Sequence, residues 1–257
     1  MSRVIPLSRP VVFLHGWTMR GSIFDNLIAK MPKRFHCHAP DLPGHGSLRT
    51  VDPTLGTAAE TLSELLETRD IRDAVLVGWS MGAAVAWEYI ERFGADRISG
   101  LMSVDMSPKL ACEPNWPHGL IGQNQDDVNA TTQRMVSDWL GLAEAAATTM
   151  FARREGAEVY SRQEALLQIN ANDSDKMIAM WKALVDMDKR DIVRKLPCPL
   201  LASCGVLSRV YPQSAAQWLA STAPQGEVHV FETSGHSPHL EEPTAFANRL
   251  VKFANSL

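Results

Sequence analysis

Short apolar runs alternate along the chain with segments in which apolar residues recur every three or four positions. The first pattern is typical of strands buried on both faces, and the second of helices that pack one face against a core. Predicted strands are 11–14, 35–39, 74–77, 98–104, 199–203 and 227–231. Predicted helices outside the middle of the chain are 23–31, 58–68, 83–92, 213–221 and 243–253. This alternation predicts an α/β fold: a mostly parallel sheet with helices on both faces.

The alternation stops between about residues 112 and 195. Helical patterns occur there at 126–140, 143–154, 162–169 and 174–185, and no convincing strand is found. We therefore predict an α/β core formed by 1–111 and 196–257. A helical cap, 112–195, would be inserted after the strand that ends near Asp105.

Composition narrows the class of protein. A chain of 257 residues with 45% hydrophobic content can form one large domain with an insertion. The net charge of −4 offers no basic field for nucleic acid, so a nucleic-acid partner is not expected. The four cysteines form no Cys-x-x-Cys pair and are expected to be reduced. Neither an apolar signal core nor a membrane-spanning run is found, so we expect a soluble cytoplasmic protein with no membrane partner.

A predicted strand, turn and helix surround Ser80. The turn reads Gly78-Trp79-Ser80-Met81-Gly82. Such a turn exposes the serine at the carboxyl edge of the sheet, and its glycines avoid Cβ clashes there. The N-terminus of the following helix favours a developing negative charge. A Gly-x-Ser-x-Gly pattern alone also arises by chance as a polar turn before a buried helix, so the prediction rests on the strand and helix around it.

Four motifs follow one another in a recognisable order. They are His15-Gly16-Trp17, the segment 41–46 (Asp-Leu-Pro-Gly-His-Gly), the turn at Ser80, and the segment 234–239 (Ser-Gly-His-Ser-Pro-His). Together they resemble the α/β-hydrolase superfamily over residues 10–257. The first and third motifs resemble especially the pimeloyl-[acyl carrier protein] methyl ester esterases, which also carry a helical cap. That superfamily usually opens with a further hairpin, so we expect a shortened N-terminal edge here, with a strand remnant at 3–7.

The resemblance implies a serine hydrolase site that needs no cofactor. Ser80 is the candidate nucleophile and His236 the candidate acid and base. The backbone N–H groups of Trp17 and Met81 are the candidate oxyanion donors. Candidate substrate-binding residues are Trp79, His15 and Gly16. Core packing is the alternative for Trp79, and a plain surface histidine is the alternative for His236.

The acid of the triad departs from the family pattern. That pattern places an aspartate at Gly-x-x-Asp after the strand that follows the cap, and here the matching residue is Ser208. Asp105 follows the strand 98–104, which we expect to lie between the strands 74–77 and 199–203. Some superfamily members place their acid after this strand, and the resemblance implies Asp105 as the third member of the triad. A turn-initiating aspartate before a Ser-Pro pair is the alternative. Weaker candidates for the acid are Asp186, Asp188 and Glu232.

Two further clusters of polar residues have plainer explanations than a binding site. His36 and His38 could chelate a metal with Asp41 or His45, but the family pattern explains 41–46 without one, so no metal site is predicted. Arginines of the predicted cap could meet an acidic carrier protein, although interleaved glutamates favour a solvated helix surface. The arginines are Arg134, Arg153, Arg154 and Arg162.

The sequence is consistent with three functions. The preferred one is a serine esterase, a carboxylic ester hydrolase acting on a small-molecule ester that is either free or bound to a carrier protein. The second is a cofactor-free dioxygenase of a heteroaromatic, quinolone-like substrate that uses the His–Asp pair. The third is a non-catalytic ligand-binding protein of the same fold. The sequence leaves the substrate and the oligomeric state open.

Overall fold

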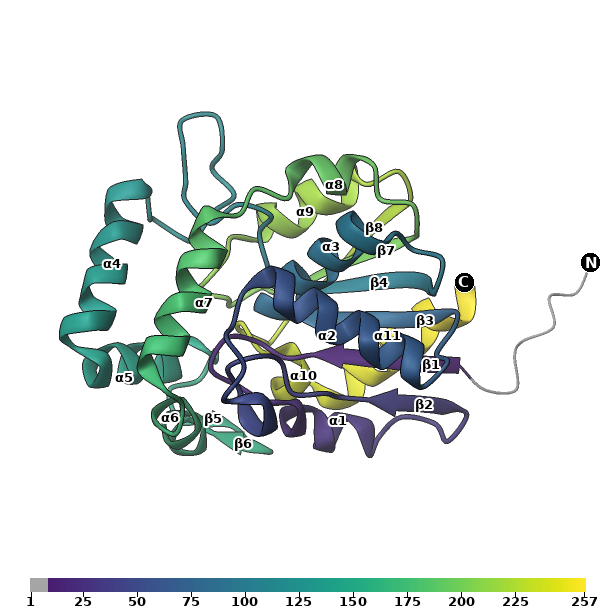
Figure 1. Cartoon of the computed structure of the whole chain (residues 1–257), viewed down its shortest axis with the longest axis horizontal. Coiled ribbons are helices and arrows are strands. Elements are labelled where there is room, and N and C mark those ends of the chain that lie inside the picture. The colour runs from purple at the N-terminus through teal and green to yellow at the C-terminus, as the bar shows by residue number, and fades with distance from the viewer. Residues whose placement is uncertain (1–8) are drawn as a thin grey trace, which may run out of the picture.

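A single parallel sheet forms the centre of the protein in the computed structural model, which describes residues 9–257 (Figure 1). The predicted remnant at 3–7 lies outside the described residues. Six strands pair in the order β2-β1-β3-β4-β7-β8, all parallel. Their bounds are β1 Arg9–Leu14, β2 Phe35–His38, β3 Ala74–Trp79, β4 Ile98–Val104, β7 Leu200–Gly205 and β8 Gly226–Phe231. This confirms the predicted fold class, including the position of β4 between β3 and β7.

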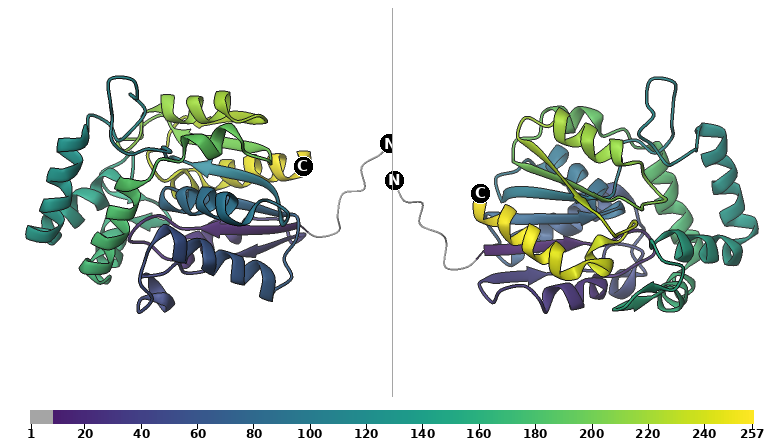
Figure 2. Two further views of the ribbon diagram at one scale, coloured as in Figure 1. Left: turned by 45° about the horizontal axis from the view of Figure 1, so that its top comes forward. Right: turned by 180° about the vertical axis from the view of Figure 1, so that it is seen from behind.

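Helices cover both faces of the sheet (Figures 1 and 2). The inner strands are therefore buried on both sides, and alternate residues enter different cores: Val12 and Leu14 pack with one hydrophobic cluster, Val11 and Phe13 with the other. Helices α2, α3 and α9 contribute to the first cluster, whereas α1 and α11 contribute to the second. Their bounds are α1 Asp25–Ile28, α2 Leu55–Thr68, α3 Met81–Phe93, α9 Gln213–Thr222 and α11 Pro243–Ser256.

The segment between β4 and β7 is mostly helical but differs from the predicted helices in several details. The helix Arg190–Arg194 was not predicted, and the predicted helix 143–154 is observed as Trp139–Thr149. Asp138 ends the predicted helix 126–140 early, because its side chain accepts a hydrogen bond from Gly141 N at 2.9 Å and so caps a new helix. A short antiparallel hairpin, β5 Gly156–Ala157 with β6 Tyr160–Ser161, was not predicted. Strands of two residues are too short to give an alternation pattern. The helices are α4 Gln125–Ser137, α5 Trp139–Thr149, α6 Arg162–Asn170, α7 Ser174–Asp186 and α8 Arg190–Arg194.

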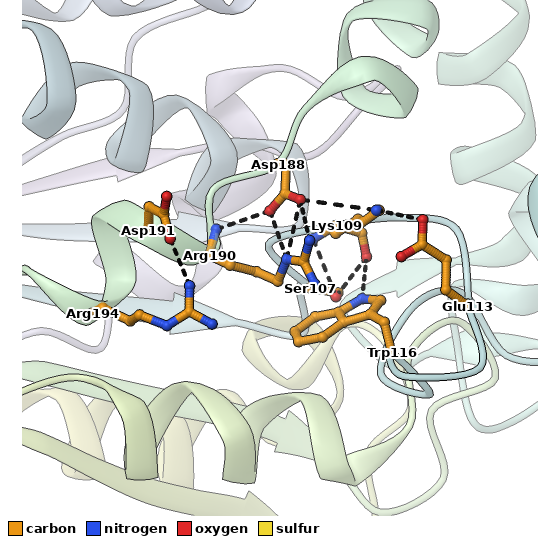
Figure 3. A network of polar contacts seen from close by, with 8 residues as sticks. All are labelled: Ser107, Lys109, Glu113, Trp116, Asp188, Arg190, Asp191 and Arg194. Carbon is orange, nitrogen blue, oxygen red and sulfur yellow. Dashed lines mark hydrogen bonds and ion pairs between the residues drawn. The ribbon is translucent and has the colours of Figure 1, made fainter.

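Polar contacts join the entrance and the exit of this segment (Figure 3). Lys109 Nζ lies 2.5 Å from a carboxylate oxygen of Glu113 and 3.9 Å from one of Asp188. Arg190 pairs with Asp188 at 2.5 Å, and its guanidinium lies 5.0 Å from the centre of a ring of Trp116. Exposed ion pairs each contribute little, about 0–1 kcal/mol. Their combined effect is to hold the two connections to the sheet side by side.

Candidate functional site

Ser80 lies on the sharp turn between β3 and α3. Its φ of 52° and ψ of −122° are unusual for a residue other than glycine. A Cβ on Gly78 would lie 2.5 Å from backbone atoms of Ala83, and one on Gly82 would lie 2.0 Å from Leu14 O. Glycine is therefore required on both sides of the serine. A strained backbone that its surroundings enforce is typical of a functional site.

His236 and Asp105 form a close pair. The imidazole Nδ1–H donates to Asp105 Oδ2 at 2.5 Å, although the two residues lie 131 positions apart in the chain. Both are buried, with 7% of His236 and 2% of Asp105 exposed. Burial raises the pKa of the Asp105 carboxyl, and the hydrogen bond with His236 opposes that rise. Trp79 Nε1 donates to His236 O at 2.8 Å and so fixes the loop that carries the imidazole.

Ser208 touches the same carboxylate. Its hydroxyl donates to Asp105 Oδ2 at 2.7 Å, so the residue in the position where the family pattern has its acid contacts the candidate acid. The weaker acid candidates lie in other surroundings. Asp188 pairs with Arg190, and Glu232 is exposed. Among residues 9–257, the hydrogen bonds and ion pairs of His236 involve Asp105 and Trp79, and neither Asp186 nor Glu232 takes part in one with it.

Two glutamates that the sequence did not single out hold the histidine loop. Glu241 accepts hydrogen bonds from Gly235 N at 2.8 Å and from Ala152 N, beyond α5, at 2.6 Å. Glu242 accepts one from the Ser234 hydroxyl at 2.5 Å. In the sequence these glutamates form an acidic pair directly before Pro243, and such a pair is equally typical of the solvated start of a helix. The sequence therefore did not indicate their role in holding the loop.

Two buried imidazoles accept hydrogen bonds from the backbone at the loop that carries Trp17 and at the neighbouring segment 41–46. His45 Nε2 accepts a hydrogen bond from Thr18 N at 3.2 Å, and His15 Nε2 accepts one from Leu42 N at 3.0 Å. Burial lowers the pKa of His15 to about 3 and that of His45 to about 4. Both rings are therefore neutral at physiological pH, as an accepting nitrogen must be.

Residues just after α6 and in α7 form hydrogen bonds with the same loop. Trp17 Nε1 donates to Met177 O at 2.9 Å, and Asn172 Nδ2 donates to Thr18 O at 2.8 Å. The position of the candidate oxyanion donor at Trp17 N thus depends on the segment between β4 and β7. Met81 is the first residue of α3, so its N–H has no acceptor within the helix. Met81 itself is fully buried and is not among the residues that line the cavity beside Ser80, whereas Trp17 is.

A largely apolar cavity of about 330 Å³ opens beside Ser80 and His236. Of the predicted substrate-binding residues, Trp79 and Gly16 line it. His15 is not among the lining residues, because its ring is fully buried below the loop. Hydrophobic residues of the segment between β4 and β7 form much of the wall, including Met135, Leu142, Trp181 and Leu184.

Charged groups at this cavity already have partners. Arg134 lines the wall and pairs with Asp138 at 3.1 Å. Arg209 also lines it and donates to Thr148 O and Phe151 O, which anchors the end of α5. Among residues 9–257 we find no cluster of three or more His, Cys, Asp or Glu side chains that could hold a metal ion. Within the same range, no helix is long and apolar enough to cross a bilayer.

His239 is a buried histidine beside the site. Its ring is fully buried, packs 4.5 Å from that of Trp79 and 5.0 Å from that of Phe24, and has no hydrogen-bond partner among the described residues. Burial lowers its pKa from 6.5 to about 3. The unfolded chain therefore binds a proton at this residue more readily than the folded protein does. The folded state loses stability as the pH falls from about 6.5 towards 3.

Replacing His239 by leucine is expected to stabilise the protein. At pH 8 the free energy of unfolding should rise by about 1–3 kcal/mol, because two buried nitrogens without partners are removed. Below pH 6.5 the gain should grow by about 1.4 kcal/mol for each pH unit. Urea unfolding of both proteins at pH 8, 6 and 5 measures this, and a gain that does not change with pH would contradict the assigned protonation.

Comparisons with known proteins agree with this geometry. Residues 11–249 match the model of a family described as the alpha/beta hydrolase family. The chain is 29% identical over 246 residues to a pimeloyl-[acyl-carrier protein] methyl ester esterase of Vibrio vulnificus, covering 95% of this chain and 93% of that protein. It is 27% identical over 251 residues to one of Chromobacterium violaceum, covering 94% and 92%.

Solved structures share the fold. An esterase from Exiguobacterium antarcticum superposes with a TM-score of 0.87 at 24% identity, covering 97% of this chain and 93% of that chain. A bromoperoxidase from Bacillus anthracis gives 0.87 at 20% identity, covering 96% and 91%. The family match spans nearly the whole chain, and the turn at Ser80 and the order of motifs agree with it. The chain belongs to the alpha/beta hydrolase family.

Proposed function

We propose that the protein hydrolyses carboxylic esters through an acyl-enzyme formed on Ser80. The observation that carries this proposal is the hydrogen-bonded pair of His236 and Asp105 at an apolar cavity that Ser80 also lines. Membership of a hydrolase family and relatives named as esterases support it.

In this mechanism the Ser80 hydroxyl attacks the ester carbonyl while His236 Nε2 takes its proton. Asp105 stays ionised, holds the Nδ1–H tautomer and stabilises the imidazolium that forms. The N–H groups of Trp17 and Met81 bind the oxyanion. His236 then protonates the leaving alcohol, and water, deprotonated by the same imidazole, releases the acid from Ser80.

The cavity suggests the class of substrate. A volume of about 330 Å³ is at the lower end of small-molecule sites, which span roughly 300–1,000 Å³. Its apolar wall suits an acyl chain of modest length. We propose an acyl ester, free or bound to a carrier protein as the names of the relatives indicate. We also propose that residues 112–195 act as a cap, because α4, α5 and α7 supply much of this wall.

Labelling by a fluorophosphonate tests the nucleophile. We expect the probe to phosphonylate Ser80, seen by mass spectrometry as an adduct on the peptide that contains it, because an activated serine attacks phosphorus as it attacks an ester. A panel of p-nitrophenyl esters of increasing acyl length should be hydrolysed, and turnover should fall as labelling proceeds. An adduct elsewhere, or hydrolysis that survives complete labelling of Ser80, would contradict the proposal.

A further inference from the structure

The hydrogen bonds around the Ser208 hydroxyl direct its hydrogen towards the Asp105 carboxylate. Backbone N–H groups of Val210 and Tyr211 lie 3.3 and 3.4 Å from Ser208 Oγ and donate to it. Its own hydrogen is left for Asp105 Oδ2, at 2.7 Å. The loop after β7 therefore presents a hydroxyl donor to the oxygen that also accepts the His236 hydrogen bond at 2.5 Å.

We propose that Ser208 is a positioning residue that aligns the Asp105 carboxylate with His236 and keeps it ionised. The inference rests on the proposed esterase mechanism. Apart from His236 Nδ1, Ser208 Oγ is the side-chain donor found on this carboxylate in residues 9–257, and Asp105 Oδ1 has no partner there. Because burial favours the neutral acid, each donor to the carboxylate shifts the balance back towards the charged form.

Other titratable groups face the pair and are the same in every variant used below. Burial raises the pKa of Cys204 to about 12 and that of Tyr211 still higher, so both are neutral near Asp105. His239, facing His236, is neutral above about pH 3. Glu241 also faces His236 and keeps its hydrogen bonds from backbone N–H groups. A shift in the titration of the pair can then be attributed to residue 208.

Replacing Ser208 by alanine should raise the proton affinity of the pair. The lost hydrogen bond favours the ionised state, so its removal should move the acid limb of kcat/KM to higher pH by about one unit, a tenfold change in proton affinity. We expect kcat at pH 7 to fall about tenfold. KM should stay unchanged, because Ser208 does not line the cavity.

Two further variants separate this role from a structural one. Ser208→Thr keeps the hydroxyl and should restore the wild-type limb. Ser203→Ala is the matched control: it removes a buried β7 hydroxyl that bonds the Ser103 carbonyl at 3.3 Å rather than the Asp105 carboxylate, and it should leave the limb in place. The proposal would be overturned if the acid limb of the pH profile of kcat/KM did not move in Ser208→Ala, whether or not KM changed. It would also be overturned if Ser208→Thr did not restore the wild-type limb.

A titration that needs no substrate keeps the two proposals apart. In ¹⁵N-histidine-labelled protein, the His236 ring nitrogens can be followed by NMR as the pH changes. We expect the midpoint in Ser208→Ala to lie about one unit above wild type. If no ester is hydrolysed and this midpoint still moves, the positioning role stands and the esterase function fails. If esters are hydrolysed and the midpoint does not move, the positioning role fails alone.

Discussion

Replacing Ser80 by alanine is expected to reduce ester hydrolysis about 10⁵–10⁶-fold in kcat. The acyl-enzyme cannot form without the hydroxyl, and the oxyanion donors and substrate binding alone leave a rate only about 10³–10⁴-fold above that of the reaction in water. Residue 80 remains in the same strained turn with φ near 52°, so the variant should fold. Steady-state rates on the best ester of the panel, with circular dichroism to verify folding, measure the effect.

His236→Ala is the matched control, because it removes the base and leaves the nucleophile in place. The esterase mechanism predicts a loss of similar size, since the two groups act as one unit. A cofactor-free dioxygenase would behave differently: oxygen uptake with a hydroxy-quinolone would survive Ser80→Ala and be lost in His236→Ala. That pattern, or an ester rate in Ser80→Ala within tenfold of wild type, would contradict the acyl-enzyme.

The predictable parts of the fold are those that depend on the local pattern of apolar and polar residues. Apolar runs identified all six strands of the main sheet, and the predicted range 98–104 is the observed extent of β4. Parallel order followed from the alternation of strands with helices, and the pairing of β4 with β3 and β7 is confirmed. Local pattern failed where one side chain decided the geometry: Asp138 splits a continuous helical pattern because its carboxylate caps the next helix.

The candidate site was predictable only as far as motifs reach. Ser80, His236 and Asp105 were named from their motifs and from the resemblance to the α/β-hydrolase superfamily, and the structure brings His236 and Asp105 into contact. The support around them is non-local and was missed. His45 serves the loop that carries Trp17 across 27 positions, and no spacing rule connects such a pair. The contact of Ser208 with Asp105 spans 103 positions and depends on β4 and β7 being neighbours in the sheet.

Asp105→Asn is expected to lower kcat about 10⁴-fold while KM changes little. An amide at this position would donate to His236 Nδ1 and select the tautomer with hydrogen on Nε2, which cannot take the proton of Ser80. Asparagine keeps the size of aspartate and tolerates the backbone φ of 45° at this residue, so the loss should be chemical rather than structural. Kinetics and thermal unfolding of the variant measure both, and a loss below tenfold would assign the acid elsewhere.

Moving the carboxylate from position 105 to position 208 should restore part of the activity that is lost when Asp105 is removed. Ser208 Oγ already lies 2.7 Å from the Asp105 oxygen that His236 contacts, so an aspartate at 208 could reach the imidazole once the side chain at 105 is gone. Glycine at 105 makes that room and accepts a positive φ. We expect Asp105→Gly combined with Ser208→Asp to exceed Asp105→Gly alone at least tenfold in kcat, because an ionised partner again selects the Nδ1–H tautomer.

Ser208→Asp in the presence of Asp105 should instead impair turnover, because two carboxylates in one buried site force one of them to take a proton. Equal rates for Asp105→Gly with and without the second change would show that the imidazole is oriented by something other than a carboxylate at this edge of the sheet.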